Sequence, residues 1–170
     1  MATTLSEAEK RKRLSELVLR FDTAMLVTRT GDGGMRARPL SIADGGDDGD
    51  ELYFSTAIES PKIHELEADP HVNVVMQDGS RFVSLSGIAR IVNDRGLIDR
   101  LWSPSWKVWF PKGKDDPSLR LLVVEPVEAA YWDMSGTQGI RYVFEMAKAY
   151  LKGTRPPSDD DERHTARVKL

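Results

Sequence analysis

The feature that most constrains the fold is a series of short apolar runs separated by turn sequences. The runs are rich in β-branched and aromatic residues, as strands are, and Gly, Pro, Asn or Asp stands between them. Six such runs occupy residues 23–29, 35–42, 52–56, 71–77, 81–92 and 119–133. The turn "TGDGG" after the first run, and the Asp-Gly after the fourth, are typical of hairpins. The sequence therefore predicts a small, mainly antiparallel barrel of six strands.

Helical patterns flank these runs. Ser6 and Glu9 form a capping box, and Leu14, Leu17 and Phe21 then recur at helical spacing. Shorter helices are expected at 60–68, 93–101 and 140–153. We expect a single domain over 1–152 that opens with an N-terminal helix at 6–20. The polar segment 153–170 contains "RPPSDDDER" and is expected to be a tail that is mobile or packs only on a partner.

Composition argues against several classes of function. The 24 Lys and Arg residues against 27 Asp and Glu leave a formal charge of −3, without the basic excess that nucleic-acid binding requires. Cysteine is absent, which is compatible with a reducing cytoplasm. No apolar run approaches the roughly 20 residues that cross a bilayer, and the N-terminus is charged where a signal peptide is apolar. We therefore expect a cytoplasmic protein that binds neither nucleic acid nor membrane.

Metal and nucleotide motifs are not recognisable in the sequence. His64, His71 and His164 are scattered without the spacing of metal ligands, so no metal site is expected. The Gly-rich stretches "GDGG" and "DGGDDGD" lack the Lys-Ser/Thr ending of a P-loop and the Gly spacing of a dinucleotide fingerprint. We interpret both as turns.

The stretch "STAIESPKIHEL", which joins the third run to a helix, is the clearest candidate for a binding site. Ser60 suits an N-cap and Pro61 the first helical position, so free backbone N–H groups and a partial positive charge are expected there. Lys62 adds a cation at the start of the helix, where the helix dipole disfavours one. This cost is removed if the lysine, the serine hydroxyl and the backbone N–H groups bind the same anion. The hydroxyls of Ser55 and Thr56 leave the strand toward the same turn. The alternative is an ordinary Ser-Pro helix start with a surface lysine.

The second run supplies two further cations. Arg36 and Arg38 in "MRARPLSI" lie on one face of a strand by period-two alternation. An arginine on a mostly buried barrel is unfavourable unless it is paired, stacked or bound to an anion. The two stretches together favour an anion site over an ordinary helix start.

These stretches resemble a known family. Arg-Pro-Leu after a hairpin turn, "LYFSTAIESPKIHELEADPHVNVVM", "FVSLSGIARIV" and "VEPVEAAYWD" resemble the flavin-binding split barrels of the pyridoxamine 5'-phosphate oxidase type. The block "LIDRLWSPSWKVWFPKGKDDPSLRLLVVEP" is similar to the branch called general stress proteins, of the general stress protein 26 kind. The resemblance covers Phe21 to about Lys152. It implies a mainly β (α+β) fold, a six-stranded antiparallel split β-barrel with flanking helices.

The resemblance also implies a cofactor, a partner and site residues. FMN lies at the interface of a homodimer in such proteins, and a strand arginine and the strand-to-helix turn hold its phosphate. The residues that match these positions here are Arg38, Ser55, Thr56, Ser60 and Lys62.

Further matching positions concern the isoalloxazine ring. The backbone of Pro39 and Leu40 is expected to lie along the ring, and Trp132 to approach it from the partner subunit. Trp109, with Trp106 and Phe110, is expected to close over the ring; the alternative is that this aromatic block only buries area near the dimer seam.

The chain also departs from the oxidases. Pro61 replaces an arginine of their turn, which implies one phosphate contact fewer and leaves FAD or a deazaflavin as alternative cofactors. The sequence after Trp132 lacks the Arg-x-His motif with which the oxidases bind their phosphorylated substrate, which argues against pyridoxamine phosphate oxidation. Arg141 stands near the place of a further phosphate arginine but at a predicted helix start, and is not counted as a ligand.

Two functions follow from the resemblance. One is an FMN-dependent oxidoreductase or flavin reductase of unknown substrate, in which the flavin performs the chemistry and no acid–base residue need be visible. The other is a non-catalytic stress protein that binds or buffers flavin. NAD(P)H oxidation above that of free FMN would separate them.

Overall fold

A sheet that closes on itself organises the protein. The computed structural model describes residues 4–44, 51–136, 144, 146–149, 151–153 and 165–170. The strands are β1 (Thr23–Arg29), β2 (Met35–Asp44), β3 (Leu52–Ala57), β4 (His71–Asp78), β5 (Arg81–Val92), β6 (Leu119–Asp133) and β7 (Thr165–Lys169). The helices are α1 (Glu7–Val18), α2 (Pro61–Ala68) and α3 (Arg95–Leu101), with short 3-10 segments η1 (Pro104–Val108) and η2 (Gly113–Asp115).

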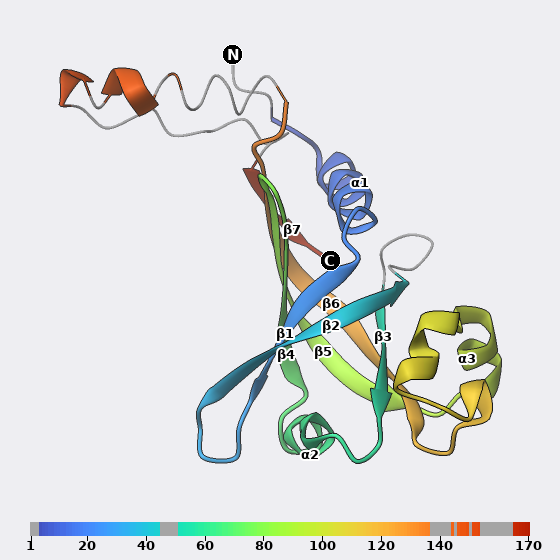
Figure 1. The fold of residues 1–170 in the computed structure, drawn as a ribbon. Coiled ribbons are helices and arrows are strands. Elements are labelled where there is room, and N and C mark those ends of the chain that lie inside the picture. The colour runs from blue at the N-terminus through green and yellow to red at the C-terminus, as the bar shows by residue number, and fades with distance from the viewer. Residues whose placement is uncertain (1–3, 45–50, 137–143, 145, 150, 154–164) are drawn as a thin grey trace.

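The strands form one antiparallel sheet in the order β3-β2-β1-β4-β5-β6-β7, and β3 also pairs with β6. That extra pairing closes six strands into a barrel and leaves β7 outside it (Figure 1). The six predicted strands and the predicted split-barrel fold with flanking helices are therefore confirmed.

The barrel is open along part of one seam. β2 pairs with β1 from Met35 to Ser41, but its pairing with β3 is limited to Ile42 with Phe54 and Asp44 with Tyr53. Beyond that point the two strands diverge toward α2, as Figure 1 shows. The edge of β2 before Ile42 therefore has no strand neighbour on the β3 side in the described part of the chain, and its backbone polar groups are available to another partner.

Two hydrophobic clusters support the barrel. The larger fills its interior and includes Leu26, Phe54 and Val74, all fully buried, and α1 covers it with Leu17 and neighbouring side chains. The smaller lies beneath α3, η1 and η2, against the outer faces of β3 and β6, with Tyr53, Ile98, Trp106 and Phe110 among its members. The second cluster fixes the lobe of residues 95–118 to the barrel.

The expectation of a mobile or partner-bound tail is wrong for its last residues. β7 pairs with β6 of the same chain, from Trp132 with Thr165 to Glu128 with Lys169. Ala166 and Val168 are 8% and 0% exposed, so alternate residues of β7 enter the main core. Residues 154–164 of the predicted tail lie outside the described residues.

The first three predicted helices are found with small changes in their bounds, as α1, α2 and α3. The capping box is present at α1, where Ser6 N–H donates to Glu9 Oε2 at 2.8 Å and Glu9 N–H to Ser6 Oγ at 3.3 Å. Residues 144, 146–149, 151 and 152 are helical, within the predicted segment 140–153. In the described part of the chain, no helix has the length and apolar character to cross a membrane.

Candidate functional site

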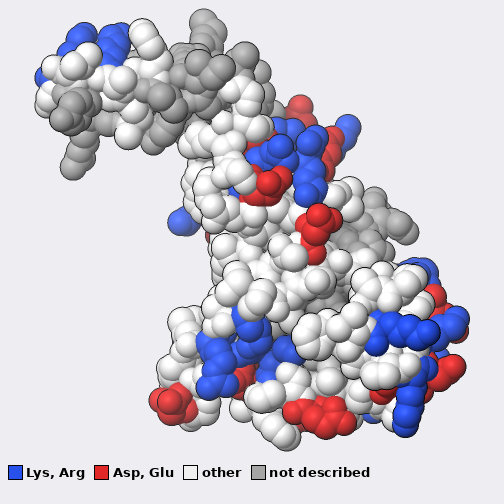
Figure 2. All heavy atoms as spheres, in the orientation of Figure 1, with Lys and Arg blue, Asp and Glu red and all other residues white. Residues whose placement is uncertain are grey.

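The two strand arginines share one face of β2, as their period-two spacing predicted. Arg36 pairs with Thr28 and Arg38 with Leu26 across β1 and β2, so both project to the side that Leu26 faces, which is the barrel interior. The Arg38 side chain is 18% exposed and the Arg36 side chain 57%. Figure 2 shows the positive charges that gather over this part of β2, beside α2.

A buried carboxylate on α2 holds both arginines. Glu65 is 9% exposed, and its Oε1 accepts from Arg36 Nη1 at 2.7 Å. Its Oε2 accepts from Arg38 Nη2 and from Thr28 Oγ1, each at 2.6 Å. Arg38 Nη2 also donates to Thr28 Oγ1 at 2.9 Å, so both hydrogens of that nitrogen are used.

The lysine of the turn is buried beside this network. Lys62 is 9% exposed, and its Nζ donates to Thr56 Oγ1 at 2.9 Å and to Ser60 Oγ at 2.7 Å. Ser60 occupies the N-cap of α2 with an extended backbone, as predicted, but its hydroxyl accepts from the lysine and does not cap the helix. The predicted turn thus assembles Thr56, Ser60 and Lys62 at the start of α2.

Unused hydrogen-bond donors show what the corner formed by Arg38, Thr56, Ser60 and Lys62 can bind. Arg38 Nη1 is buried and has no hydrogen-bond partner among the described residues. An ammonium has three N–H groups, and only two of those on Lys62 have acceptors in the described part of the chain. A buried donor without an acceptor is unfavourable, so an anion that accepts from both groups would remove that penalty. The residues present fit a phosphate group.

Burial and neighbouring charges shift the pKa values of Glu65 and Lys62. Burial raises the pKa of the Glu65 carboxyl, but hydrogen bonds from Thr28 and Arg38, and the charges of the two arginines, outweigh it and hold this pKa below its ordinary value. Burial, and next the positive charge of Arg38, lower the pKa of Lys62, whereas Glu65 raises it. A bound anion would favour the charged form of Lys62 and so counteract the effect of burial on its pKa.

Some predicted ligands lie apart from this corner. Ser55 follows Tyr53 on the outer side of β3, whereas Thr56 shares the inner side with Phe54, since neighbours on a strand alternate. The prediction that the hydroxyls of Ser55 and Thr56 point to one place is therefore wrong. Pro39 is exposed on the outer face of β2, and Leu40 packs against the main core. Their backbone lies on the stretch of β2 that β3 leaves open.

The aromatic block divides into core and surface. Trp106 and Phe110 are 5% and 2% exposed in the second cluster, and Trp106 packs edge-to-face on Trp102 with ring centroids 5.7 Å apart. They bury area within one chain, so the expectation that these two close over a flavin is wrong. Trp109 is 77% exposed and remains free to contact a ligand or a partner.

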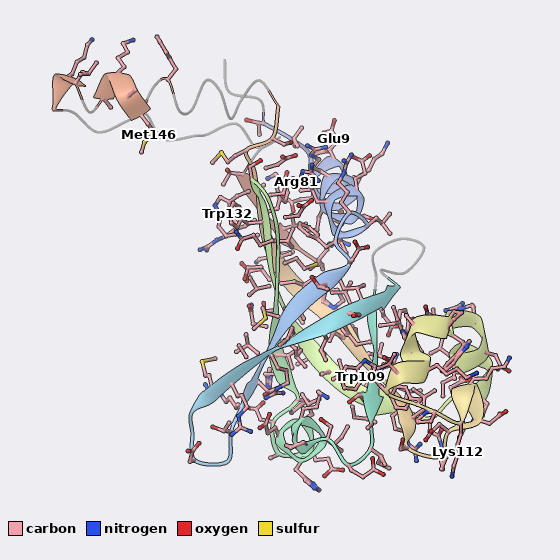
Figure 3. All side chains as sticks on the ribbon, viewed as in Figure 1. Glu9, Arg81, Trp109, Lys112, Trp132 and Met146 are labelled. Carbon is pink, nitrogen blue, oxygen red and sulfur yellow. The ribbon has the colours of Figure 1, made fainter. Side chains whose placement is uncertain are left out.

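Trp132 lies far from the corner within one chain. Figure 3 places Trp132 toward the end of the sheet that carries α1, whereas Trp109 lies on the lobe at the α2 end. Trp132 is 38% exposed and contributes, with Val75, Phe82 and Met134, to an apolar pocket of about 410 Å³ on the outer face of β4, β5 and β6. Any contact of Trp132 with a ligand at the corner requires another chain.

Sequence reasoning missed Thr28 and Glu65. The sequence held a signal for Glu65, because residues 62, 65 and 66 are spaced to share one helix face. The structure shows that all three are buried. Thr28 carried no signal of its own, since a polar residue within a strand normally reads as solvent-facing. Arg141 lies outside the described residues.

Comparison with known proteins agrees with the fold. Residues 9–157 match the protein family described as pyridoxamine 5'-phosphate oxidase like. General stress protein 26 of Bacillus subtilis (strain 168) is 37% identical in an alignment of 84 residues that covers 46% of this chain and 59% of that protein. Protein bli-3 of Neurospora crassa is 30% identical in an alignment of 134 residues that covers 72% of this chain and 64% of that protein. The matched segment spans less than two thirds of either relative.

A solved structure gives the same result. The general stress FMN/FAD binding protein of Xanthomonas citri superposes with a TM-score of 0.64 at 30% identity, over 74% of this chain and 89% of that one. The family match, the general stress relatives and the closed six-stranded barrel agree. The chain therefore belongs to the pyridoxamine 5'-phosphate oxidase-like family, and its relatives there include general stress protein 26.

Proposed function

We propose that this protein binds FMN, with the terminal phosphate held in the corner formed by Arg38, Thr56, Ser60 and Lys62. The observation that carries the proposal is the buried Nη1 of Arg38, which has no acceptor among the described residues. A phosphate oxygen there would complete the hydrogen bonding of Arg38 and of Lys62, whose described partners are hydroxyl groups.

The isoalloxazine ring would lie along the open edge of β2. The edge before Ile42 offers backbone N–H and C=O groups that no strand of the described residues uses on the β3 side, and the polar edge of the ring carries complementary groups. Pro39 and Leu40 lie on this stretch. Ser55 would contact the cofactor only on the outer side of β3. The Xanthomonas citri relative is described as binding FMN or FAD, so FAD and a deazaflavin are the competing cofactors.

We further propose that two copies of the chain complete the site. Met25, Val75 and Trp132 are 39%, 37% and 38% exposed on the outer face of the sheet, where Met25 pairs with Val75 across neighbouring strands. Together with Phe82 and Met134 of the pocket, they form an apolar band, defined by these five residues. An exposed apolar band of this kind is typical of a protein interface. In the dimer, Trp132 of the second copy would approach the flavin.

The proposed reaction class is oxidoreduction. Bound flavin would supply hydride or electron transfer, and the chain would bind and orient it. The activity is that of an FMN-dependent oxidoreductase or flavin reductase in the cytoplasm; buffering of flavin without turnover is the alternative. The FMN-loaded protein should oxidise NAD(P)H, with an acceptor present, faster than free FMN does. Turnover equal to that of free FMN would favour the buffering function.

The binding proposal is tested by comparing FMN with riboflavin, which lacks the phosphate. Titration of each flavin with the protein, followed by flavin fluorescence, gives two dissociation constants. We expect FMN to bind at least about 100-fold more tightly, since two or more charge-assisted hydrogen bonds to phosphate would contribute about 1.5 to 3 kcal/mol each. Equal affinities would show that the corner does not hold phosphate.

A further inference from the structure

Glu65 is the unexpected member of the corner, because a carboxylate beside an anion site weakens the attraction for the anion. It is buried on α2 and accepts from both arginines and from Thr28, at 2.6 to 2.7 Å. Its position one helical turn after Lys62 places it on the same face of α2. The corner therefore contains its own negative charge.

The contacts of Glu65 determine the orientation of the Arg38 guanidinium. Both hydrogens of Arg38 Nη2 are taken, one by Glu65 Oε2 at 2.6 Å and one by Thr28 Oγ1 at 2.9 Å. A guanidinium is a rigid planar fork, so fixing one terminal nitrogen fixes the direction of the other. The other nitrogen is Nη1, which is buried and has no partner among the described residues.

Glu65 also sets the charge of the corner. Arg38 and Lys62 of the corner contribute two positive charges, and Arg36, which shares Glu65 with Arg38, contributes a third. Glu65 removes one, so the net charge of this group is about +2. A terminal phosphomonoester carries about −1.5 to −2 at neutral pH. Each phosphate of a diester or pyrophosphate linkage carries a single negative charge and matches the corner less well.

We propose that Glu65 is the positioning and selectivity residue of the phosphate corner. It holds Arg38 so that Nη1 faces the phosphate, and it matches the charge of the corner to a phosphomonoester dianion. This inference rests on the proposed binding of FMN. It concerns how the corner selects its ligand, beyond the binding itself.

The test compares Glu65→Gln with the control Glu67→Gln on the same helix. Glu67 is exposed, and its side chain pairs with His64 Nδ1 at 3.4 Å on the surface of α2. Both variants and the parent are titrated with FMN, FAD and riboflavin. Charge alone predicts that Glu65→Gln binds FMN more tightly, because a negative charge is removed; the positioning role predicts the opposite sign.

We expect Glu65→Gln to bind FMN about tenfold more weakly, with riboflavin affinity unchanged, as for the loss of one well-placed charge-assisted hydrogen bond. Its preference for FMN over FAD should fall, whereas Glu67→Gln should behave as the parent. Thr28→Val, which removes the other group that holds Arg38, should change FMN affinity in the same direction and serves if Glu65→Gln does not fold.

Three outcomes would overturn the inference. FMN affinity that is unchanged or increased in Glu65→Gln would show that Arg38 needs no orientation by Glu65. An equal weakening of FMN and riboflavin would assign Glu65 a general structural role. Weakening in Glu65→Gln without any in Thr28→Val would separate Glu65 from the geometry of Arg38. If the parent itself shows no preference for FMN over riboflavin, the proposed function fails, and this result is distinct from all three.

Discussion

Lys62 offers the most direct perturbation of the phosphate corner, because a single substitution removes its charge and keeps much of its shape. In Lys62→Met the ammonium that donates to Thr56 and Ser60, at 2.9 and 2.7 Å, is replaced by an apolar end of similar length. If the third N–H of Lys62 binds phosphate, the variant loses one charge-assisted hydrogen bond, worth about 1.5 to 3 kcal/mol. FMN affinity should then fall about 10- to 150-fold.

The same substitution should not destabilise the ligand-free protein by more than about 1 kcal/mol, the contribution of an ordinary hydrogen bond. Burial lowers the pKa of Lys62, so folding disfavours its charged form. The parent bears this cost in full below the lowered folded-state pKa, and the cost fades as pH rises from there toward the unfolded-state value. Any stability advantage of Lys62→Met should therefore be largest near neutral pH and shrink in alkali.

The assay is a fluorescence titration with FMN and riboflavin, paired with urea denaturation of the ligand-free protein. Lys112→Met is the matched control, since Lys112 is an exposed lysine on the lobe, away from the corner (Figure 3). We expect a selective loss of FMN affinity in Lys62→Met alone. If Lys62→Met binds FMN as tightly as the parent does, the turn is only a helix start and the account of the corner is wrong.

Three further predictions concern β7, Glu65 and the apolar band. Val168→Ala should lower the free energy of unfolding by about 1 to 3 kcal/mol, since Val168 is 0% exposed. The control Val127→Ala, at a position 53% exposed, should change this free energy by less than about 0.5 kcal/mol. Equal effects of the two substitutions in urea denaturation would contradict the packing of β7. Because the folded-state pKa of Glu65 is lowered, its contribution to stability is present above the ordinary carboxyl pKa and lost as pH falls through the lowered value. The destabilisation by Glu65→Gln should therefore vanish in acid, and a difference from the parent that persists there would refute the charged state. Val75→Asp should convert a dimer into a monomer in light scattering after gel filtration, because it places a charge in the apolar band; an unchanged mass would place the interface elsewhere.

The barrel was predictable because its strands carry strong local signals. Each of the six has β-branched or aromatic residues between turn sequences, and hairpin turns fix the pairing of neighbours. β7 was missed although "TARVK" alternates, with Ala166 and Val168 facing inward. The polar stretch before it dominates the composition of the tail. This short run is a strand because it pairs with Glu128–Trp132 of β6, which lie beyond the part of β6 that pairs with β3.

The site was predictable in part for a similar reason. Arg38 and Lys62 stand out because a cation is unfavourable where each lies, and so they signalled a partner. The spacing of Glu65 from Lys62 places both on one face of α2, but a glutamate on a short helix is usually exposed. Only the assembled structure shows that Glu65 forms ion pairs with both arginines. The division of the aromatic block into buried Trp106 and exposed Trp109 depends on how the lobe packs, which spacing alone does not determine.

We propose that the corner at Arg38 holds the phosphate of FMN. The most direct measurement is the visible absorption spectrum of the purified protein after it is mixed with FMN and free ligand is removed by gel filtration. We expect a retained flavin band in the parent and a reduced band in Arg38→Gln, which removes the buried Nη1 donor. A parent protein that elutes without a flavin band would contradict the claim.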